Sequence, residues 1–360
     1  MGKKLAIIST LIAIFGVIVI YGSSISWAIN YNGYKEYFFI RQLIYFILGI
    51  AVMLFSMRID YHFYSKRKNL LLFIGIILLI LVLIPGIGIV RNGSRSWLGY
   101  RQLGFQPSEI VKLIMIIYTA HYLCVNKNEM SKIKGLIPIL LVLAIVFGLL
   151  MLEPDFGTGF ITVMISMLMI LLSGIKKRYL FGGIGIGLGI ILILILSAPY
   201  RLQRIFAFLD PWSDPLGAGF QTIQALYAIV PHGIFGTGLF KGMQKNLFLS
   251  QIFNDFIYSS VVEQTGLIGG MGLIFAYLFL FYYGIKIALK AKDLFGTYLA
   301  VGIIISLFIQ FAINLAVVLN LIPITGTTLP FISYGGSSLL INFMMVGILI
   351  NIDSQNHLFL

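Results

Sequence analysis

The sequence predicts an all-α, polytopic membrane protein with ten transmembrane helices and one large structured extracellular loop. Of the 360 residues, 59% are hydrophobic and only 10% are charged, and the mean hydropathy is +1.01. A globular domain carries about 25% charged residues, so this chain has too little polar surface for a soluble particle. Residues 1–360 are therefore expected to form a single integral membrane domain.

The ten spans are predicted from apolar runs, because a helix needs about 20 mostly apolar residues to cross a bilayer. The first run begins directly after Met1-Gly-Lys-Lys, as in a signal peptide, but nine further runs follow it, so it is interpreted as a retained helix. The second run is short. The predicted spans are about 5–22, 42–57, 70–90, 108–126, 136–152, 157–175, 180–199, 256–285, 295–321 and 334–352.

Lysine and arginine set the expected orientation. The connections on one side of the membrane carry 15 of these residues, and the opposite connections carry 9. The cluster Lys176-Lys177-Arg178 lies in a very short loop, where the positive-inside rule is most reliable. Both termini are therefore predicted to be cytoplasmic, and the net charge of +13 is interpreted as membrane topology rather than nucleic-acid binding.

Residues 200–255, between spans seven and eight, form the large extracellular loop. Its length is roughly ten times that of a usual connection, and its many aromatic residues argue against a disordered linker. We expect short amphipathic helices on the membrane surface here. Function is often found in a long structured loop on a rigid scaffold.

Asp255 closes this loop at the start of the eighth span. A carboxylate at that position has two interpretations. It caps the helix N-terminus, or it serves as a general base whose pKa is raised by partial desolvation at the membrane boundary.

Two further carboxylate groupings are predicted. Glu109 and Lys112 stand three residues apart on the fourth span, so they share a helix face as a structural ion pair or as a substrate contact. Glu153 and Asp155 flank Pro154 at the outer start of the sixth span. They are candidate ligands for a divalent cation such as Mg²⁺ or Mn²⁺, and helix capping explains them equally well.

Seven cations face outward against the topological bias, which suggests an anionic ligand. Arginine binds phosphate through bidentate hydrogen bonds, and lipid headgroups are the alternative ligand. The candidates are Arg91, Arg95, Arg101, Arg201, Arg204, Lys241 and Lys245.

The segment 323–338 is uncharged and rich in proline and glycine. Irregular backbone at membrane depth is tolerated only where it lines a cavity or is buried in protein. This segment is therefore expected to line the outward cavity, with Ser337 and Ser338 as candidate substrate contacts. A nucleotide site is excluded because no Gly-Lys-Ser/Thr follows the glycines.

The single cysteine, Cys124, rules out a disulfide framework, a cysteine-ligated zinc site and an iron–sulfur cluster. The four histidines are scattered along the chain, so they do not suggest an imidazole metal cluster either.

Five ordered motifs, which together span nearly the whole chain, resemble the SEDS family (shape, elongation, division and sporulation). The motif around Arg91, and the separate segment 197–200 before the large loop, look closer to the FtsW and SpoVE branch than to RodA. The motifs are 91–99 with 105–112, 154–159, 200–204 through 210–221, Asp255-Phe-Ile with Glu263, and the C-terminal Thr325-Gly-Thr-Thr-Leu-Pro-Phe-Ile-Ser-Tyr-Gly-Gly-Ser-Ser338.

This resemblance implies a ten-helix peptidoglycan glycosyltransferase in the bacterial cytoplasmic membrane. It would polymerise lipid II on the outer face into a β-1,4-linked, lipid-attached glycan. The implied partner is a class B penicillin-binding protein, with further division, elongation or sporulation proteins. Asp255 matches the family's essential aspartate, Glu109 and Lys112 match its intramembrane ion pair, and external basic positions of the family are matched by Arg95, Arg201, Arg204 and Lys245.

The chain departs from the family pattern in residues 250–254, where the usual proline, glutamate and hydroxyl residue before Asp255 are absent. This departure leaves a non-catalytic scaffold open as an alternative function, and the Glu109–Lys112 pair leaves a lipid II flippase open. A lipid II flippase would use the Glu109–Lys112 pair inside the membrane, although the halves of the chain show no convincing inverted repeat. A non-catalytic scaffold would activate the penicillin-binding protein.

Overall fold

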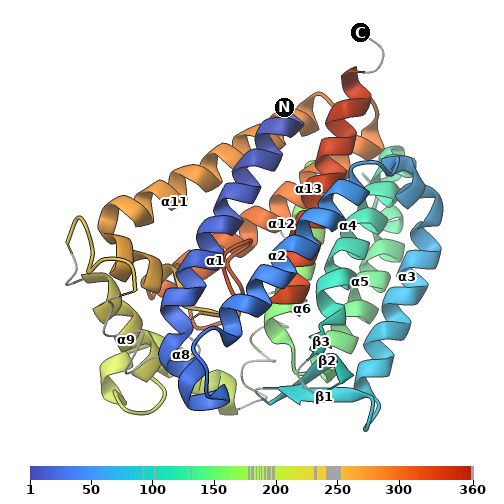
Figure 1. Cartoon of the computed structure of the whole chain (residues 1–360). Coiled ribbons are helices and arrows are strands. Elements are labelled where there is room, and N and C mark those ends of the chain that lie inside the picture. Colours follow the sequence, from blue (N-terminus) through green and yellow to red (C-terminus); the bar gives the residue numbers. More distant parts are fainter. Residues whose placement is uncertain are drawn as a thin grey trace.

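Long apolar helices form the body of the molecule in the computed structural model (Figure 1). The structure describes residues 1–357 except 92, 101–102, 131, most of 177–198, 231–232 and 241–252. The long helices are α1 (Gly2–Asn32), α2 (Tyr37–Ser56), α3 (Tyr61–Leu83), α4 (Pro107–Val125), α5 (Ile133–Leu152), α6 (Phe156–Leu172), α11 (Ile257–Leu289), α12 (Leu294–Val318) and α13 (Gly336–His357).

Within the described ranges, seven helices are long and apolar enough to cross a membrane. The helices α3 and α6 do not meet this criterion, although both lie at predicted spans. The predicted span 180–199 falls mostly on residues outside the described part of the chain. A multi-pass helical membrane protein is therefore what the structure supports, and the count of ten spans stays a prediction.

The third predicted span, 70–90, overlaps α3, but its predicted bounds lie several residues too far toward the C-terminus. The helix α3 begins at Tyr61, because the Asp60 carboxylate caps it by accepting a hydrogen bond from the backbone N–H of His62. It ends at Leu83, shortly before Pro85 and Gly86, which break the helical pattern.

A small antiparallel sheet follows α3 and corrects the all-α expectation. Its strands are β1 (Gly88–Arg91), β2 (Ser94–Tyr100) and β3 (Leu103–Phe105), in the order β1-β2-β3. In the β1–β2 pairing Arg91 lies opposite Ser94, and the sequence between them is Asn-Gly, the dipeptide favoured in tight hairpins.

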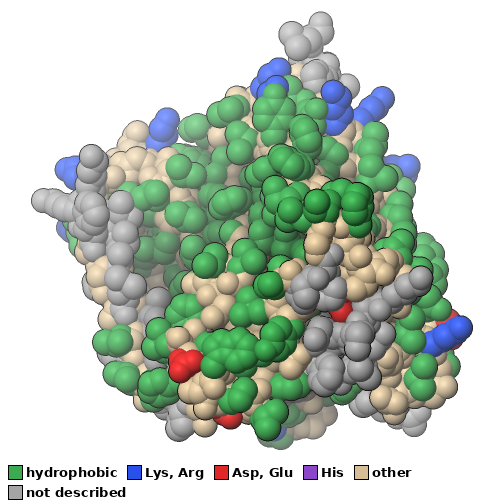
Figure 2. Space-filling view, turned by 90° about the vertical axis from the view of Figure 1, so that its left-hand side faces the viewer, with side chains coloured by type: hydrophobic (Ala, Val, Ile, Leu, Met, Phe, Trp, Pro, Cys, Tyr) green, Lys and Arg blue, Asp and Glu red, His purple; other side chains and the backbone are tan. Residues whose placement is uncertain are grey.

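The start of α1 and the end of α13 lie at one end of the bundle, and the sheet lies at the opposite end (Figure 1). The N-terminal amine and the Asp353 carboxylate, near the end of α13, form an ion pair of 2.8 Å. Figure 2 shows a face largely covered by hydrophobic side chains, with most of the visible Lys and Arg near the end that carries the termini. This distribution is consistent with the predicted orientation.

The large loop contains short helices, as expected: α8 (Pro199–Leu209) and α9 (Phe220–Ile229). They lie at the same end of the molecule as the sheet (Figure 1). A 3-10 turn, η2 (Pro211–Ser213), lies between them.

The helix α11 is broken at Gly266, where φ is +67°. Loop residues 233–238 pair with this break: the Thr237 N–H donates to the Glu263 carbonyl at 2.9 Å, and the Leu267 N–H donates to the Gly233 carbonyl at 3.2 Å. This part of the large loop is thereby attached to a membrane helix by main-chain hydrogen bonds.

Candidate functional site

The segment between α12 and α13 is the centre of the site, because several elements meet on it. It begins at Pro323 and runs without regular structure to the turn around Phe331. Its left-handed residue Gly326, with φ of +74°, faces Asp255: a Cβ at Gly326 would lie 3.9 Å from Asp255 Oδ2. This irregular segment, which the sequence predicted only to line the outward cavity, thus lies against the candidate base.

Asp255 does not cap α11. The N-cap residue is Phe256, and no side chain makes a capping hydrogen bond at that helix end. The Asp255 side chain is half-buried. Burial raises its pKa from 3.8 to about 6, and the positive charge of Arg204 offsets part of this effect. A carboxylate with this pKa is ionised at neutral pH and is a stronger base than an exposed aspartate.

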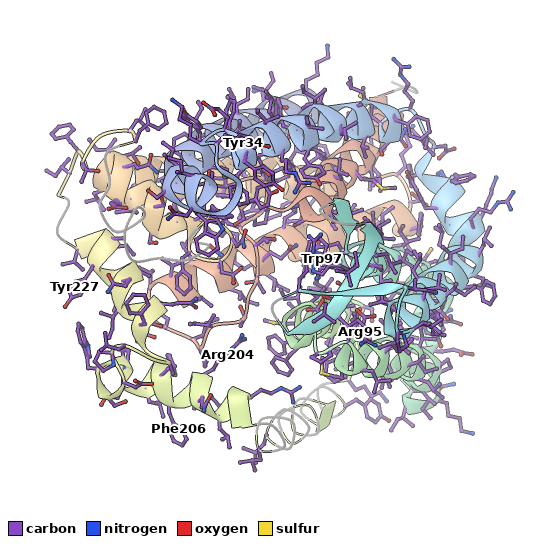
Figure 3. The ribbon with its side chains drawn as sticks, turned by 60° about the horizontal axis from the view of Figure 1, so that its bottom comes forward. Tyr34, Arg95, Trp97, Arg204, Phe206 and Tyr227 are labelled. Carbon is purple, nitrogen blue, oxygen red and sulfur yellow. The ribbon has the colours of Figure 1, made fainter. Side chains whose placement is uncertain are left out.

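Arg204 projects from α8 toward the central segment, whereas Phe206 on the same helix points away from the molecule (Figure 3). Its guanidinium Nη1 donates a hydrogen bond to the Ile324 carbonyl at 3.1 Å. Arg201, one turn earlier, places its guanidinium 5.4 Å from the centre of the Phe156 ring at the start of α6. Arg204 therefore contacts the central segment directly, whereas Arg201 packs against the start of α6.

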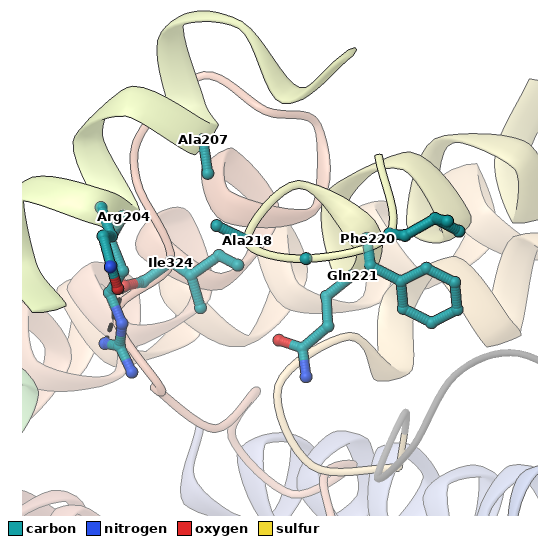
Figure 4. Close-up of a pocket in the computed structure, with 9 residues that line it drawn as sticks. Arg204, Ala207, Ala218, Phe220, Gln221 and Ile324 are labelled. Carbon is teal, nitrogen blue, oxygen red and sulfur yellow. Dashed lines mark hydrogen bonds between the residues drawn. The ribbon is translucent and has the colours of Figure 1, made fainter. Parts of the chain in front are cut away.

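A cleft of about 390 Å³ opens beside Arg204 (Figure 4). It combines a guanidinium and amide groups with apolar side chains, a mixture suited to a polar ligand with an apolar portion. Its lining residues are Gln203, Arg204, Ala207, Leu216, Gly217, Ala218, Phe220, Gln221 and Ile324.

Asp155 caps α6, the alternative that the sequence left open. Its Oδ1 accepts from the Thr158 N–H at 3.2 Å, and its Oδ2 accepts from Gln106 Nε2 at 3.0 Å and from Ser108 Oγ at 2.9 Å. Protein donors therefore already occupy both carboxylate oxygens.

Glu153 is fully buried, and neither of its carboxyl oxygens has a hydrogen-bond partner. Burial, with a smaller contribution from the charge of Asp155, raises the pKa of Glu153 from 4.5 to about 8. The group is therefore mostly protonated at neutral pH, a poor state for holding a hard cation.

The predicted divalent-cation site therefore fits these two residues poorly. Among the described residues, no group of three or more His, Cys, Asp or Glu side chains is placed to hold a metal ion. Dependence on a divalent cation stays a prediction, to be tested by chelation.

Glu109 and Lys112 form the predicted ion pair, with Lys112 Nζ 2.7 Å from Glu109 Oε2. Lys112 also donates to Gln310 Oε1 at 3.0 Å, so the pair connects α4 with α12. Both charged side chains are buried. The contacts fit the structural interpretation of this pair.

The other predicted contacts are spread around the site. Ser337 Oγ accepts from the Gln106 N–H at 3.0 Å, and Ser338 Oγ lies 3.0 Å from Thr328 Oγ1. Arg95, on β2, donates from Nη1 to the Leu83 carbonyl at 3.3 Å and so attaches the sheet to α3. The candidates Arg101, Lys241 and Lys245 lie outside the described residues.

Sequence reasoning missed Asn314 and Ser333, which contact the main chain beside Asp255. Asn314 lies within an apolar span, and a polar residue there is a signal of function or buried contact. Ser333 lies in the segment 323–338, which the sequence had indicated. Its partner is the backbone carbonyl of Asn254, and every residue has such a group, so the sequence gives no sign of the contact.

Comparison with known proteins finds similarity along nearly the whole chain. The model of the FtsW/RodA/SpoVE family, described as cell cycle protein, matches residues 3–358. Stage V sporulation protein E of Bacillus subtilis is 45% identical, over 97% of this chain and 96% of that protein. The probable peptidoglycan glycosyltransferase FtsW of Geobacter metallireducens is 39% identical, over 95% and 91%.

Solved structures have the same fold. A chain from a peptidoglycan synthase complex that coordinates polymerization and crosslinking superimposes with a TM-score of 0.80 at 25% identity, over 99% of this chain and 98% of that one. The rod shape determining protein RodA of Thermus thermophilus gives a TM-score of 0.73 at 22% identity, over 98% and 97%.

Proposed function

The chain belongs to the FtsW/RodA/SpoVE family, and from this premise we propose that it is a peptidoglycan glycosyltransferase that polymerises lipid II on the outer face of the bacterial cytoplasmic membrane. The observation that carries the proposal is the half-buried Asp255 carboxylate, with a pKa of about 6, beside Arg204. A poised base next to a fixed cation suits a reaction that removes a proton and releases a diphosphate.

In the proposed reaction, Asp255 accepts the proton of the 4-hydroxyl group of an acceptor N-acetylglucosamine. The hydroxyl oxygen attacks the anomeric carbon of the lipid-linked donor, and the bond from that carbon to the diphosphate oxygen breaks. The diphosphate leaves with the electron pair. One displacement converts an α-linked donor into a β-1,4-linked product, so the donor anomeric centre is inverted.

A diphosphate is a good leaving group, so a second carboxylic acid is not needed, unlike in the usual pair of a glycosidase. The leaving group needs its developing negative charge neutralised. Arg204, fixed at 3.1 Å to the Ile324 carbonyl, and Arg201 on the same helix are the described cations placed for this role. No step is assigned to a divalent ion.

Apolar helices beside this end of the molecule would guide the polyprenyl tails of donor and acceptor. Confining both reactants to one surface lowers the entropic cost of bringing them together. We further propose ten transmembrane helices, cytoplasmic termini and a class B penicillin-binding protein as partner. The likeness to a chain of a peptidoglycan synthase complex supports this partner.

The test is polymerisation of labelled lipid II by the purified chain with its cognate penicillin-binding protein, whose transpeptidase serine is blocked by a β-lactam. We expect long glycan strands that lysozyme degrades, since this enzyme cleaves β-1,4 linkages. A folded complex that makes no glycan but moves labelled lipid II between leaflets would instead support the flippase. A complex that does neither would support the scaffold.

A further inference from the structure

The main chain before α11 is held at three successive carbonyl groups. The Tyr334 N–H donates to the Phe253 carbonyl at 2.8 Å, and Ser333 Oγ donates to the Asn254 carbonyl at 2.6 Å. Asn314 Nδ2 donates to the Asp255 carbonyl at 2.8 Å. The candidate base therefore sits at the end of a short segment whose carbonyl groups are all bound by other elements.

The donors are themselves fixed. Asn314 lies on α12, is 1% exposed, and uses its Nδ2 a second time to donate to the Thr327 carbonyl at 2.8 Å. It therefore joins the Asp255 main chain to the central segment, on the side of the segment next to Gly326. An amide nitrogen carries two hydrogens, and both are used here.

Two further hydrogen bonds hold Ser333. Its Oγ accepts from the Leu329 N–H at 2.8 Å, and its carbonyl accepts from Gln42 Nε2 of α2 at 3.3 Å. The next side chain, Tyr334, packs edge-on against Phe253, with ring centres 5.7 Å apart. The turn that supplies two of the three donors is thus anchored to α2 as well as to the segment it holds.

The side chain of Asn314 also contains an unsatisfied buried acceptor, which a residue selected only for stability would lack. Its Oδ1 is buried and has no hydrogen-bond partner, and an unsatisfied buried acceptor lowers the stability of the folded protein. What the residue supplies is two donors at the carbonyl groups of Asp255 and Thr327. A misplacement of about 1 Å at a reacting group can cost about a hundredfold in rate, so fixing the Asp255 backbone has catalytic value.

We propose that Asn314 and Ser333 are positioning residues that hold Asp255 in its working geometry, through its own and the preceding main-chain carbonyl. This inference rests on the proposed function, in which Asp255 is the general base. Neither side chain is assigned a contact with substrate, so their loss should lower kcat and leave KM nearly unchanged.

The first variant is Asn314→Leu, which keeps the approximate shape of the side chain, removes both donors and adds no charge. Its matched control is Asn351→Leu on α13. Asn351 is also buried, its Nδ2 donates to the Met57 carbonyl at 2.9 Å, and its Oδ1 accepts from the Tyr61 N–H at 3.0 Å. These contacts lie toward the end of the bundle that carries the termini, away from Asp255.

In the lipid II polymerisation assay we expect Asn314→Leu to lower kcat more than tenfold with KM within threefold of wild type. The control should keep kcat within twofold at a comparable loss of melting temperature. The smaller change Ser333→Ala should lower kcat several-fold. The double variant should lose less than the product of the two single effects, because both residues hold the same segment.

Hydrogen–deuterium exchange provides a readout that does not depend on catalysis. Exchange in the peptide covering 253–258 should rise in Asn314→Leu and stay at the wild-type level in Asn351→Leu. Folded Asn314→Leu and Ser333→Ala proteins with wild-type kcat, or unchanged exchange in that peptide, would overturn the proposal. Absence of glycan synthesis by the wild type would overturn the proposed function, and exchange would still decide whether the two residues hold the segment.

Discussion

The pKa of Asp255 gives a prediction about the pH dependence of the reaction. The general base must be ionised, and kcat/KM reports the ionisation of the free protein. With a pKa of about 6, roughly half of the molecules are active at pH 6, about nine tenths at pH 7 and about one tenth at pH 5. We therefore expect kcat/KM to fall about tenfold between pH 7 and pH 5.

Arg204 supplies the perturbation that tests this assignment. Its positive charge lowers the pKa of Asp255 against the effect of burial, so Arg204→Gln should move the acid limb of the profile to higher pH. The matched control is Arg201→Gln, because Arg201 also lies on α8 but packs on the Phe156 ring. This control should leave the midpoint in place, even if the rate falls.

The assay is the initial rate of glycan synthesis from labelled lipid II at low substrate concentration, measured from pH 4.5 to 8. Stability of each variant is checked over the same range, so that unfolding is not mistaken for titration. A wild-type midpoint near 4, the value of an exposed aspartate, would refute the reasoning. An equal shift in both arginine variants would refute the role of Arg204.

Three further predictions concern stability in detergent, measured as the melting temperature. In the folded protein the pKa of Glu153 is raised from 4.5 to about 8, so the free energy of unfolding is highest below pH 4.5 and falls as the pH rises toward 8, by at most about 3 kcal/mol at pH 7. Glu153→Gln should therefore have a higher melting temperature than wild type at pH 7 and nearly the same one at pH 5. An equal difference at both pH values would contradict the raised pKa of Glu153. Lys112→Met should lower the free energy of unfolding by about 3–5 kcal/mol, because it leaves the buried Glu109 carboxylate unpaired. Adding Glu109→Gln to this variant should restore part of the lost stability. Gly266→Ala should lower the free energy of unfolding by about 1–3 kcal/mol, because the φ of Gly266 is +67° and the new Cβ would lie 2.2 Å from a backbone oxygen. The control Gly272→Ala, in the same helix and with open space around it, should leave the stability unchanged or raise it.

Much of the helical fold could be predicted from the sequence, because transmembrane helices are recognised by long apolar runs. Each predicted span within the described residues coincides with a helix, although α1 extends ten residues beyond its predicted end at 22. The sheet at 88–105 was missed, since its strands are short and were read as part of a span and its loop. The Asn92-Gly93 dipeptide between β1 and β2 was the available signal.

The site was predicted in part. Asp255, Arg204 and the segment 323–338 were chosen for their charge and composition, and the structure brings them together. The roles of Asn314 and Ser333 were not foreseeable, because each acts on a backbone carbonyl. Any residue supplies such a group, so only the fold decides which carbonyl groups face these donors.

Polymerisation of labelled lipid II by Asp255→Asn beside the wild type tests most directly whether Asp255 is the general base. Asparagine has the same shape and cannot accept the proton, and a general base contributes roughly 10²–10⁴ in rate. We predict that wild type makes long glycan, whereas a folded Asp255→Asn protein binds lipid II with unchanged Kd and polymerises it at least about a hundredfold more slowly. Glycan synthesis by Asp255→Asn within tenfold of wild type would contradict the assignment of Asp255 as the base.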